Sequence, residues 1–94
     1  MRNKSLGLVH TAVATATASA VEVAANTSRS FLLLENKSAI VVYYRVDGTT
    51  VTSANGITLL PGAIHTYDAD GGVPSGAITM IAASGTPAVL VVTK

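Results

Sequence analysis

The stretch at residues 30–62, SFLLLENKSAIVVYYRVDGTTVTSANGITLLPG, decides the fold class. It contains short runs of β-branched, aromatic and large aliphatic residues, namely FLLL at 31–34, IVVYYRV at 40–46 and ITLL at 57–60. Polar residues at 36–38, Asp-Gly at 47–48 and Pro-Gly at 61–62 separate or end these runs, and such residues favour tight turns. Runs of this composition between turn residues are typical of strands and hairpins. The stretch therefore predicts an all-β domain.

The second half of the chain continues the pattern. We predict strands at 31–35, 40–46, 57–60, 63–67, 77–82 and 88–93, and short loops favour antiparallel pairing. With the N-terminal part, the count is seven or eight strands, which indicates a single antiparallel β-sandwich or jelly-roll-like barrel. We expect the core to contain Phe31, Leu33, Ile40 or Val41, Ile57, Leu59, Ile78, Leu90 and Val92.

The N-terminal part differs in composition. Residues 11–25 alternate Ala with Val, Thr and Ser, which favours an extended strand. Two alternatives stay open for residues 1–20. They form either an N-terminal arm that reaches a neighbouring molecule or a first strand within its own sheet. We expect residues 21–94 to form the sandwich domain. For residues 1–10 we expect the arm. The basic start is similar to a signal peptide, but Gly7, His10 and Thr11 interrupt the apolar run, so we expect the segment to be retained.

The composition indicates a protein that associates with other chains. Of the 94 residues, 49% are hydrophobic and 12% are charged, against roughly 25% charged in a typical soluble domain. This deficit leaves little polar cover, so we expect part of the apolar surface to be buried in an assembly. The alternative is a mild, uncharged surface of Ala, Thr and Ser. The chain has no cysteine, so oligomerisation is the stabiliser that remains.

Several functional classes find no support in the residues. The net charge of +1 and six scattered basic residues offer no path for phosphates, so we expect no nucleic-acid partner. No run approaches the ~18 apolar residues of a membrane helix, so we expect no membrane partner. His65, Asp68 and Asp70 lie close together, but the bidentate Glu of a calcium loop is missing, and a solvated turn is expected. We predict no catalytic, cofactor-binding or metal-binding residues and no enzymatic activity.

Two groups of residues are candidates for partner binding. The first comprises the large apolar side chains before residue 14, and the second comprises tyrosines that could form a sugar-binding platform. Adjacent residues of a strand point to opposite faces, so only one of Tyr43 and Tyr44 can join Tyr67. The candidate partner-binding residues are Leu6, Leu8, Val9, Val13, Tyr43 and Tyr67.

The segment ANTSRSFLLLEN at 25–36 resembles a pattern in small structural proteins of tailed bacteriophages. GITLLPG at 56–62, VPSGAI at 73–78 and AASGT at 82–86 match further elements of that pattern, so the resemblance covers about residues 20–94. It implies a virion β-sandwich on the capsid surface, a decoration (cement) protein that binds across capsomer junctions. The implied partners are the major capsid protein or other virion proteins, and further copies of the chain in a homo-oligomer, with a trimer favoured.

Two alternative functions stay open. One is a head–tail accessory protein of the virion. The other is a carbohydrate-binding or adhesive β-sandwich module of a fibre or a cell surface.

Overall fold

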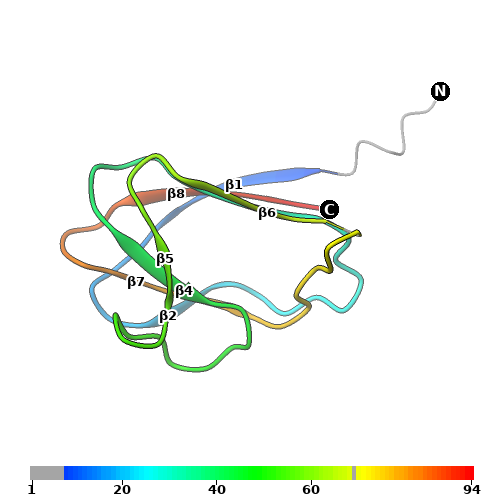
Figure 1. The fold of residues 1–94 in the computed structure, drawn as a ribbon, viewed down its shortest axis with the longest axis horizontal. Helices are drawn as coiled ribbons and strands as arrows, with labels where there is room; N and C mark the ends of the chain where they lie inside the picture. Colours follow the sequence, from blue (N-terminus) through cyan, green and yellow to red (C-terminus); the bar gives the residue numbers. More distant parts are fainter. Residues whose placement is uncertain (1–7, 69) are drawn as a thin grey trace.

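The computed structural model describes residues 8–68 and 70–94, which form eight strands and no helix. Sheet A has the strand order β1-β8-β3-β6 and sheet B the order β2-β7-β4-β5, and every pairing is antiparallel. The strands are β1 (Val9–Ala14), β2 (Ala20–Val23), β3 (Leu32–Asn36), β4 (Val42–Arg45), β5 (Ile57–Leu59), β6 (Ile64–Tyr67), β7 (Ile78–Ala82) and β8 (Ala88–Thr93). Figure 1 shows the sheets edge-on as two layers, with sheet A above sheet B. The predicted all-β antiparallel sandwich is confirmed.

The core lies between the two sheets. Sheet A contributes Leu32, Leu34, Val89 and Val91, and sheet B contributes Val42, Tyr44, Leu59, Ile78 and Met80. Each of these side chains is almost completely removed from solvent. None of the described residues forms a helix long and apolar enough to cross a membrane.

The predicted core was right for Leu59 and Ile78 and wrong for most of the other residues named. Leu59 and Ile78 are buried in the core as expected. In β3, however, Leu32 and Leu34 point inward, and the predicted Leu33 is only half-buried. The predicted core residues Phe31, Ile40, Val41 and Leu90 are also only half-buried, Ile57 is exposed, and Val92 is buried on the face of β8 away from the core. The error arises because both faces of these strands are apolar, and a slip of one residue exchanges the faces.

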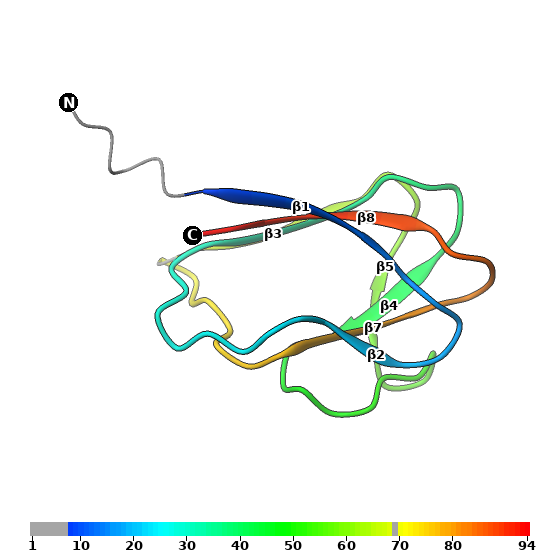
Figure 2. The ribbon, with the colours of Figure 1, turned by 180° about the vertical axis from the view of Figure 1, so that it is seen from behind.

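The N-terminal residues that are described belong to the sandwich. β1 pairs with β8 from Val9 opposite Thr93 to Ala14 opposite Ala88, and β2 pairs with β7. The expectation of an arm is therefore wrong for Val9 and His10, while residues 1–7 lie outside the described residues. The alternating stretch at 11–25 is not one strand, because the chain crosses from sheet A to sheet B at residues 15–19 (Figure 2).

Two hydrogen bonds hold this crossing between the sheets. The Thr15 N–H donates to the Pro87 carbonyl at 2.9 Å, and the Ala82 N–H donates to the Ala16 carbonyl at 2.8 Å. The Thr15 side chain is fully buried, and its hydroxyl lies 3.8 Å from the Met80 sulfur. The crossing thus joins the edge of sheet A to the edge of sheet B on the side where β1 and β2 lie.

Two buried polar side chains tie the loops to the strands. The Asn36 amide nitrogen donates to the carbonyls of Ile40 (2.7 Å) and Leu59 (3.0 Å). The Arg29 guanidinium donates to three carbonyls, those of Ala24, Pro74 and Gly76. Buried polar groups are tolerated when they are hydrogen-bonded, so these contacts allow both residues to stabilise the ends of the sandwich.

Leu33 and Leu34 of β3 test the outward and inward faces of this strand. Leu34→Ala should lower the free energy of unfolding by about 2–5 kcal/mol because it opens a cavity in the core. Leu33→Ala, on the other face of the same strand, should cost clearly less. Chemical denaturation of the two variants measures the difference, and a larger loss for Leu33→Ala would contradict the orientation of β3.

Candidate partner-binding site

The outer face of sheet A is apolar. Alternate residues of a strand point to opposite faces, so the neighbours of the core residues in β3 and β8 point away from sheet B. In the pairing register, Leu33 lies opposite Val92, and Glu35 lies between Leu90 and Ile64. We call this surface the outer face of sheet A, and its apolar residues are Ala12, Ala14, Leu33, Ile64, Ala88, Leu90 and Val92, with Phe31 just before β3.

Charge is nearly absent from this face. Its strand residues include one carboxylate, Glu35, which forms an ion pair with Lys37 at 3.4 Å. An antiparallel sheet with one face in water usually carries polar residues on that face. The apolar outer face of sheet A is therefore a candidate surface for contact with another molecule.

Sheet B differs because its own chain covers its outer face. The loop at 46–56 lies beneath sheet B in both ribbon views, on the side away from sheet A. The Thr79 hydroxyl, on β7, donates to the Thr49 carbonyl at 2.7 Å, and the Val51 N–H donates to the Ser19 hydroxyl at 3.1 Å. Val51 is almost fully buried although it lies in a loop. The loop at 46–56 thus covers part of the outer face of sheet B.

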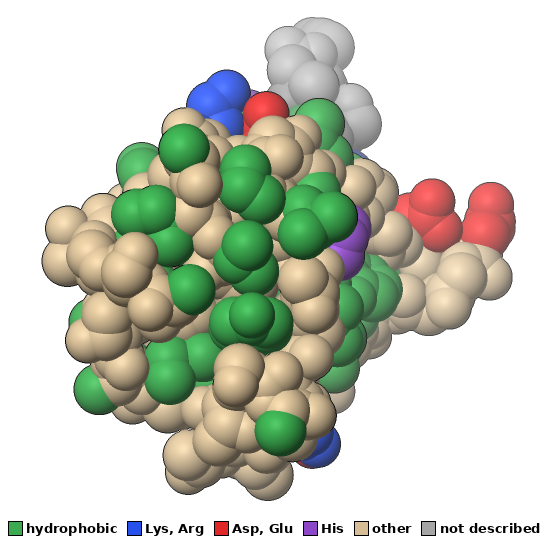
Figure 3. Space-filling model, turned by 60° about the vertical axis from the view of Figure 1, so that its left-hand side comes forward, with side chains coloured by type: hydrophobic (Ala, Val, Ile, Leu, Met, Phe, Trp, Pro, Cys, Tyr) green, Lys and Arg blue, Asp and Glu red, His purple; other side chains and the backbone are tan. Residues whose placement is uncertain are grey.

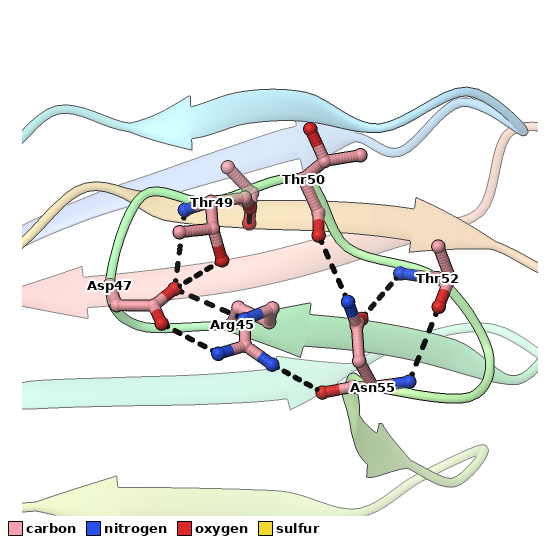
Figure 4. A network of polar contacts seen from close by, with 7 residues as sticks. Arg45, Asp47, Thr49, Thr50, Thr52 and Asn55 are labelled. Carbon is pink, nitrogen blue, oxygen red and sulfur yellow. Dashed lines mark hydrogen bonds and ion pairs between the residues drawn. The ribbon is translucent and has the colours of Figure 1, made fainter.

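Polar contacts fix the shape of this loop, as Figure 4 shows. The Arg45 guanidinium donates to both carboxylate oxygens of Asp47, at 3.1 and 2.6 Å, and to the Asn55 carbonyl at 2.8 Å. The Asn55 side chain in turn accepts from the Thr52 N–H and donates to the Thr50 carbonyl. The two ends of the loop are therefore bound to each other.

The same contacts make the loop sensitive to acid. The hydrogen bonds from Arg45, together with those from Thr49, hold the pKa of Asp47 well below its usual range. A carboxyl whose pKa is lower in the folded protein stabilises the fold above the unfolded pKa, about pH 4. This contribution is lost as the pH falls from about 4 toward the lowered pKa of the folded protein, where the carboxyl becomes protonated and no longer pairs with Arg45.

Tyr43 lies on the outer face of sheet B, at a groove beside the loop. The groove has a volume of about 420 Å³, and its lining residues are Tyr43, Thr52, Ser53, Ile81, Ala82 and Ala83. Tyr43 is half-buried. The predicted partner-binding residue is thus accessible, although it lies on a different face from the apolar surface of sheet A.

Tyr67 has an internal role. The Tyr44 hydroxyl lies 2.7 Å from the Tyr67 hydroxyl and 2.8 Å from Nδ1 of His65, and so joins sheet B to sheet A. Burial, and to a lesser degree Tyr67, raises the pKa of Tyr44. It is Tyr44 that meets Tyr67, so Tyr43 and Tyr67 do not form one sugar-binding platform.

The N-terminal candidates also separate. Leu8 and Val9 are exposed at the start of β1, by 42% and 56%, whereas Val13 packs against the core. Leu6 lies outside the described residues. Prediction from sequence assigned Leu33 and Leu90 to the core and so missed their place on the outer face of sheet A. For Leu90 a signal was present, because both faces of residues 88–93 are apolar, which is typical of a strand that is central or covered by a partner.

A further group of exposed apolar side chains lies where β5 and β6 form the sheet edges. It comprises Ile57, Leu60 and Ile64, which are exposed by 40%, 57% and 54%. Figure 3 shows a side of the molecule on which hydrophobic side chains are spread over the middle, while charged groups lie at the margin. Ile64 also belongs to the outer face of sheet A, so the two apolar regions meet at β6.

Residues with metal-binding chemistry do not gather in the described part of the chain. It contains no group of three or more His, Cys, Asp or Glu side chains that could hold a metal ion. The Asp68 carboxylate accepts hydrogen bonds from the N–H groups of Asp70 and Gly71, so it closes a turn. Comparisons with protein-family models, curated proteins and solved structures give no match.

The tyrosine pair allows a matched test of the inter-sheet hydrogen bonds. Tyr44→Phe should lower the free energy of unfolding by about 1–2 kcal/mol, because Tyr67 and His65 lose a buried partner. Tyr43→Phe, on the outer face of sheet B, should stay within about 0.5 kcal/mol of the native protein. Denaturant titration measures both, and equal effects would contradict the assigned faces.

Gly56 tests the contact between the loop and sheet B. A Cβ atom at this position would lie 2.7 Å from the Cβ of Tyr43 and 2.7 Å from a methyl group of Val51. Gly56→Ala should therefore cost about 1–3 kcal/mol of stability through overpacking. Gly71→Ala is the control, since its nearest atom would be 3.9 Å away. A thermal midpoint that is equal for both variants would show that the loop does not lie against the sheet.

Proposed function

We propose that this chain is a structural protein of a tailed-bacteriophage virion, a decoration protein that binds the capsid surface through the outer face of sheet A. The observation that supports the proposal is the contrast between the two sheets. Val51 and the loop at 46–56 cover sheet B. On the outer face of sheet A, Leu33 and Leu90 remain partly exposed and Ile64 is 54% exposed.

Burial of this face supplies the binding energy. A large aliphatic side chain that passes from water to an apolar contact contributes about 1.5–3 kcal/mol, and Leu33, Leu90 and Ile64 lie within one face. A largely apolar surface with a single carboxylate, Glu35, is suited to a protein subunit whose own face is apolar, such as the major capsid protein or another virion protein. Many copies on one shell would add contacts at high effective concentration.

The segments that resemble phage structural proteins contact one another. Arg29, from the segment at 25–36, donates to the carbonyls of Pro74 and Gly76 in the segment at 73–78. Asn36 donates to the Leu59 carbonyl in the segment at 56–62. The resemblance therefore falls on residues that hold the sandwich together, and it supports a shared fold more directly than a shared binding face.

The test places a charge on each outer face in turn. Leu33→Lys puts an ammonium group on the outer face of sheet A and should abolish co-sedimentation of the chain with assembled shells of a tailed-phage major capsid protein. Thr58→Lys is the control, because Thr58 is exposed on β5, opposite Tyr43. It should co-sediment like the native chain. Circular dichroism checks that both variants are folded.

Other outcomes would separate the alternatives. Recovery of the chain only with tail or neck fractions of disrupted virions would favour a head–tail accessory protein. Binding to a glycan surface that is lost in Tyr43→Ala, with no binding to capsids, would favour the adhesive module. Either result would overturn the decoration role.

A further inference from the structure

The outer edge of β1 carries backbone groups that no strand among the described residues pairs. β1 is the first strand of sheet A and has β8 on one side only. The Thr15 N–H donates to Pro87 in the direction of β8, and bonding groups alternate in direction along an antiparallel strand. Val9, Thr11 and Val13 therefore direct their N–H and C=O groups to β8. The N–H and C=O groups of His10, Ala12 and Ala14 point away from the sheet.

The pairing of β8 with β3 supports this assignment independently. The Lys94 N–H donates to the Phe31 carbonyl, and the Lys37 N–H donates to the Ala88 carbonyl. Even-numbered residues of β8 thus bond to β3, which leaves odd-numbered ones such as Val91 to bond to β1. Val91 lies opposite Thr11, as the assignment requires.

β1 is also the least protected of the four sheet edges. β2 has four residues, a bulge between Val21 and Val23, and a charged residue, Glu22. β5 and β6 have only three and four residues. β1 has six residues in unbroken register, without proline, lysine or carboxylate, and it is exposed along most of its length. Edges that do not pair usually carry charges, prolines or bulges that prevent pairing.

We propose that two copies of the chain pair through their β1 edges, antiparallel and about a two-fold axis at Ala12. In this arrangement Ala12 lies opposite Ala12 of the second copy, and His10 lies opposite Ala14 of the second copy. All outward N–H and C=O groups of β1 then gain partners, and the two copies of sheet A form one continuous sheet of eight strands.

The sequence of β1 fits a second copy of itself. An isologous contact brings identical residues together at the axis, and a small alanine there lets the backbones approach. No carboxylate or ammonium group of β1 meets its equal, because β1 has none. The two His10 side chains face alanines and lie on either side of the axis. Self-pairing therefore carries no like-charge penalty.

The paired sheets change the binding surface. With the axis perpendicular to the sheet, both outer faces of sheet A point the same way, so Leu90 and Val92 of each copy belong to one apolar surface of double width. The inference concerns the assembly of the free protein and does not depend on capsid binding. It predicts a dimer in place of the trimer that the resemblance to phage proteins implies.

Single cysteines in this cysteine-free chain test the pairing directly. Opposite residues of a hydrogen-bonded antiparallel pair have Cα atoms ~5.5 Å apart, within the range of a disulfide. Ala12→Cys should therefore give a covalent dimer on mild oxidation. Ala88→Cys is the control, because Ala88 is exposed on β8, one strand inside the edge. It should remain monomeric on a denaturing, non-reducing gel.

A charge at the axis provides the second measurement. Ala12→Lys should convert the native dimer to a folded monomer in sedimentation velocity, since two ammonium groups would meet at the axis. Ala88→Lys should remain a dimer. A native chain that is monomeric at high micromolar concentration would overturn the proposal. A trimer that Ala12→Lys leaves intact, or equal cross-linking of both cysteine variants, would also overturn it.

Discussion

The structure depends on the face-to-face packing of two small sheets whose core contains few large side chains. Leu32 and Leu34 of β3 and Val42 and Tyr44 of β4 belong to one buried cluster between the two sheets. With no disulfide to constrain the unfolded chain, this apolar layer provides the main stabilisation. Every strand must therefore keep its register, because a shift of one residue would move its core side chains to the outside.

The strands were predictable from sequence, whereas the directions of their side chains were not. Turn residues such as Pro61 mark strand ends independently of the tertiary structure, so most strand positions were right. In β3, however, Leu32, Leu33 and Leu34 are the same residue type, and local sequence cannot tell which face is inside. The inward face is set by the partner, since Leu34 lies opposite His65 and Val91 in the neighbouring strands.

The candidate site was harder to predict for a related reason. An apolar residue in a strand is normally assigned to the core, so Leu33 and Leu90 were expected there and not on a binding face. Conversely, Val51 has a polar sequence environment and no strand of its own, yet it is buried because the loop at 46–56 folds over sheet B. Long-range contacts between a loop and a sheet leave no periodic signal in the sequence.

The outer faces of the two sheets thus differ in how their apolar surface is covered. Sheet B is covered by eleven residues of its own chain (residues 46–56), fixed by the Arg45–Asp47 pair and by Asn55. On the outer face of sheet A, Leu33 and Leu90 remain partly exposed and Ile64 is exposed. Leaving an apolar face in water is unfavourable, because the free energy of its exposure grows with the apolar area. The asymmetry has a physical rationale if another molecule provides the cover for sheet A, and the unprotected edge of β1 belongs to that same sheet.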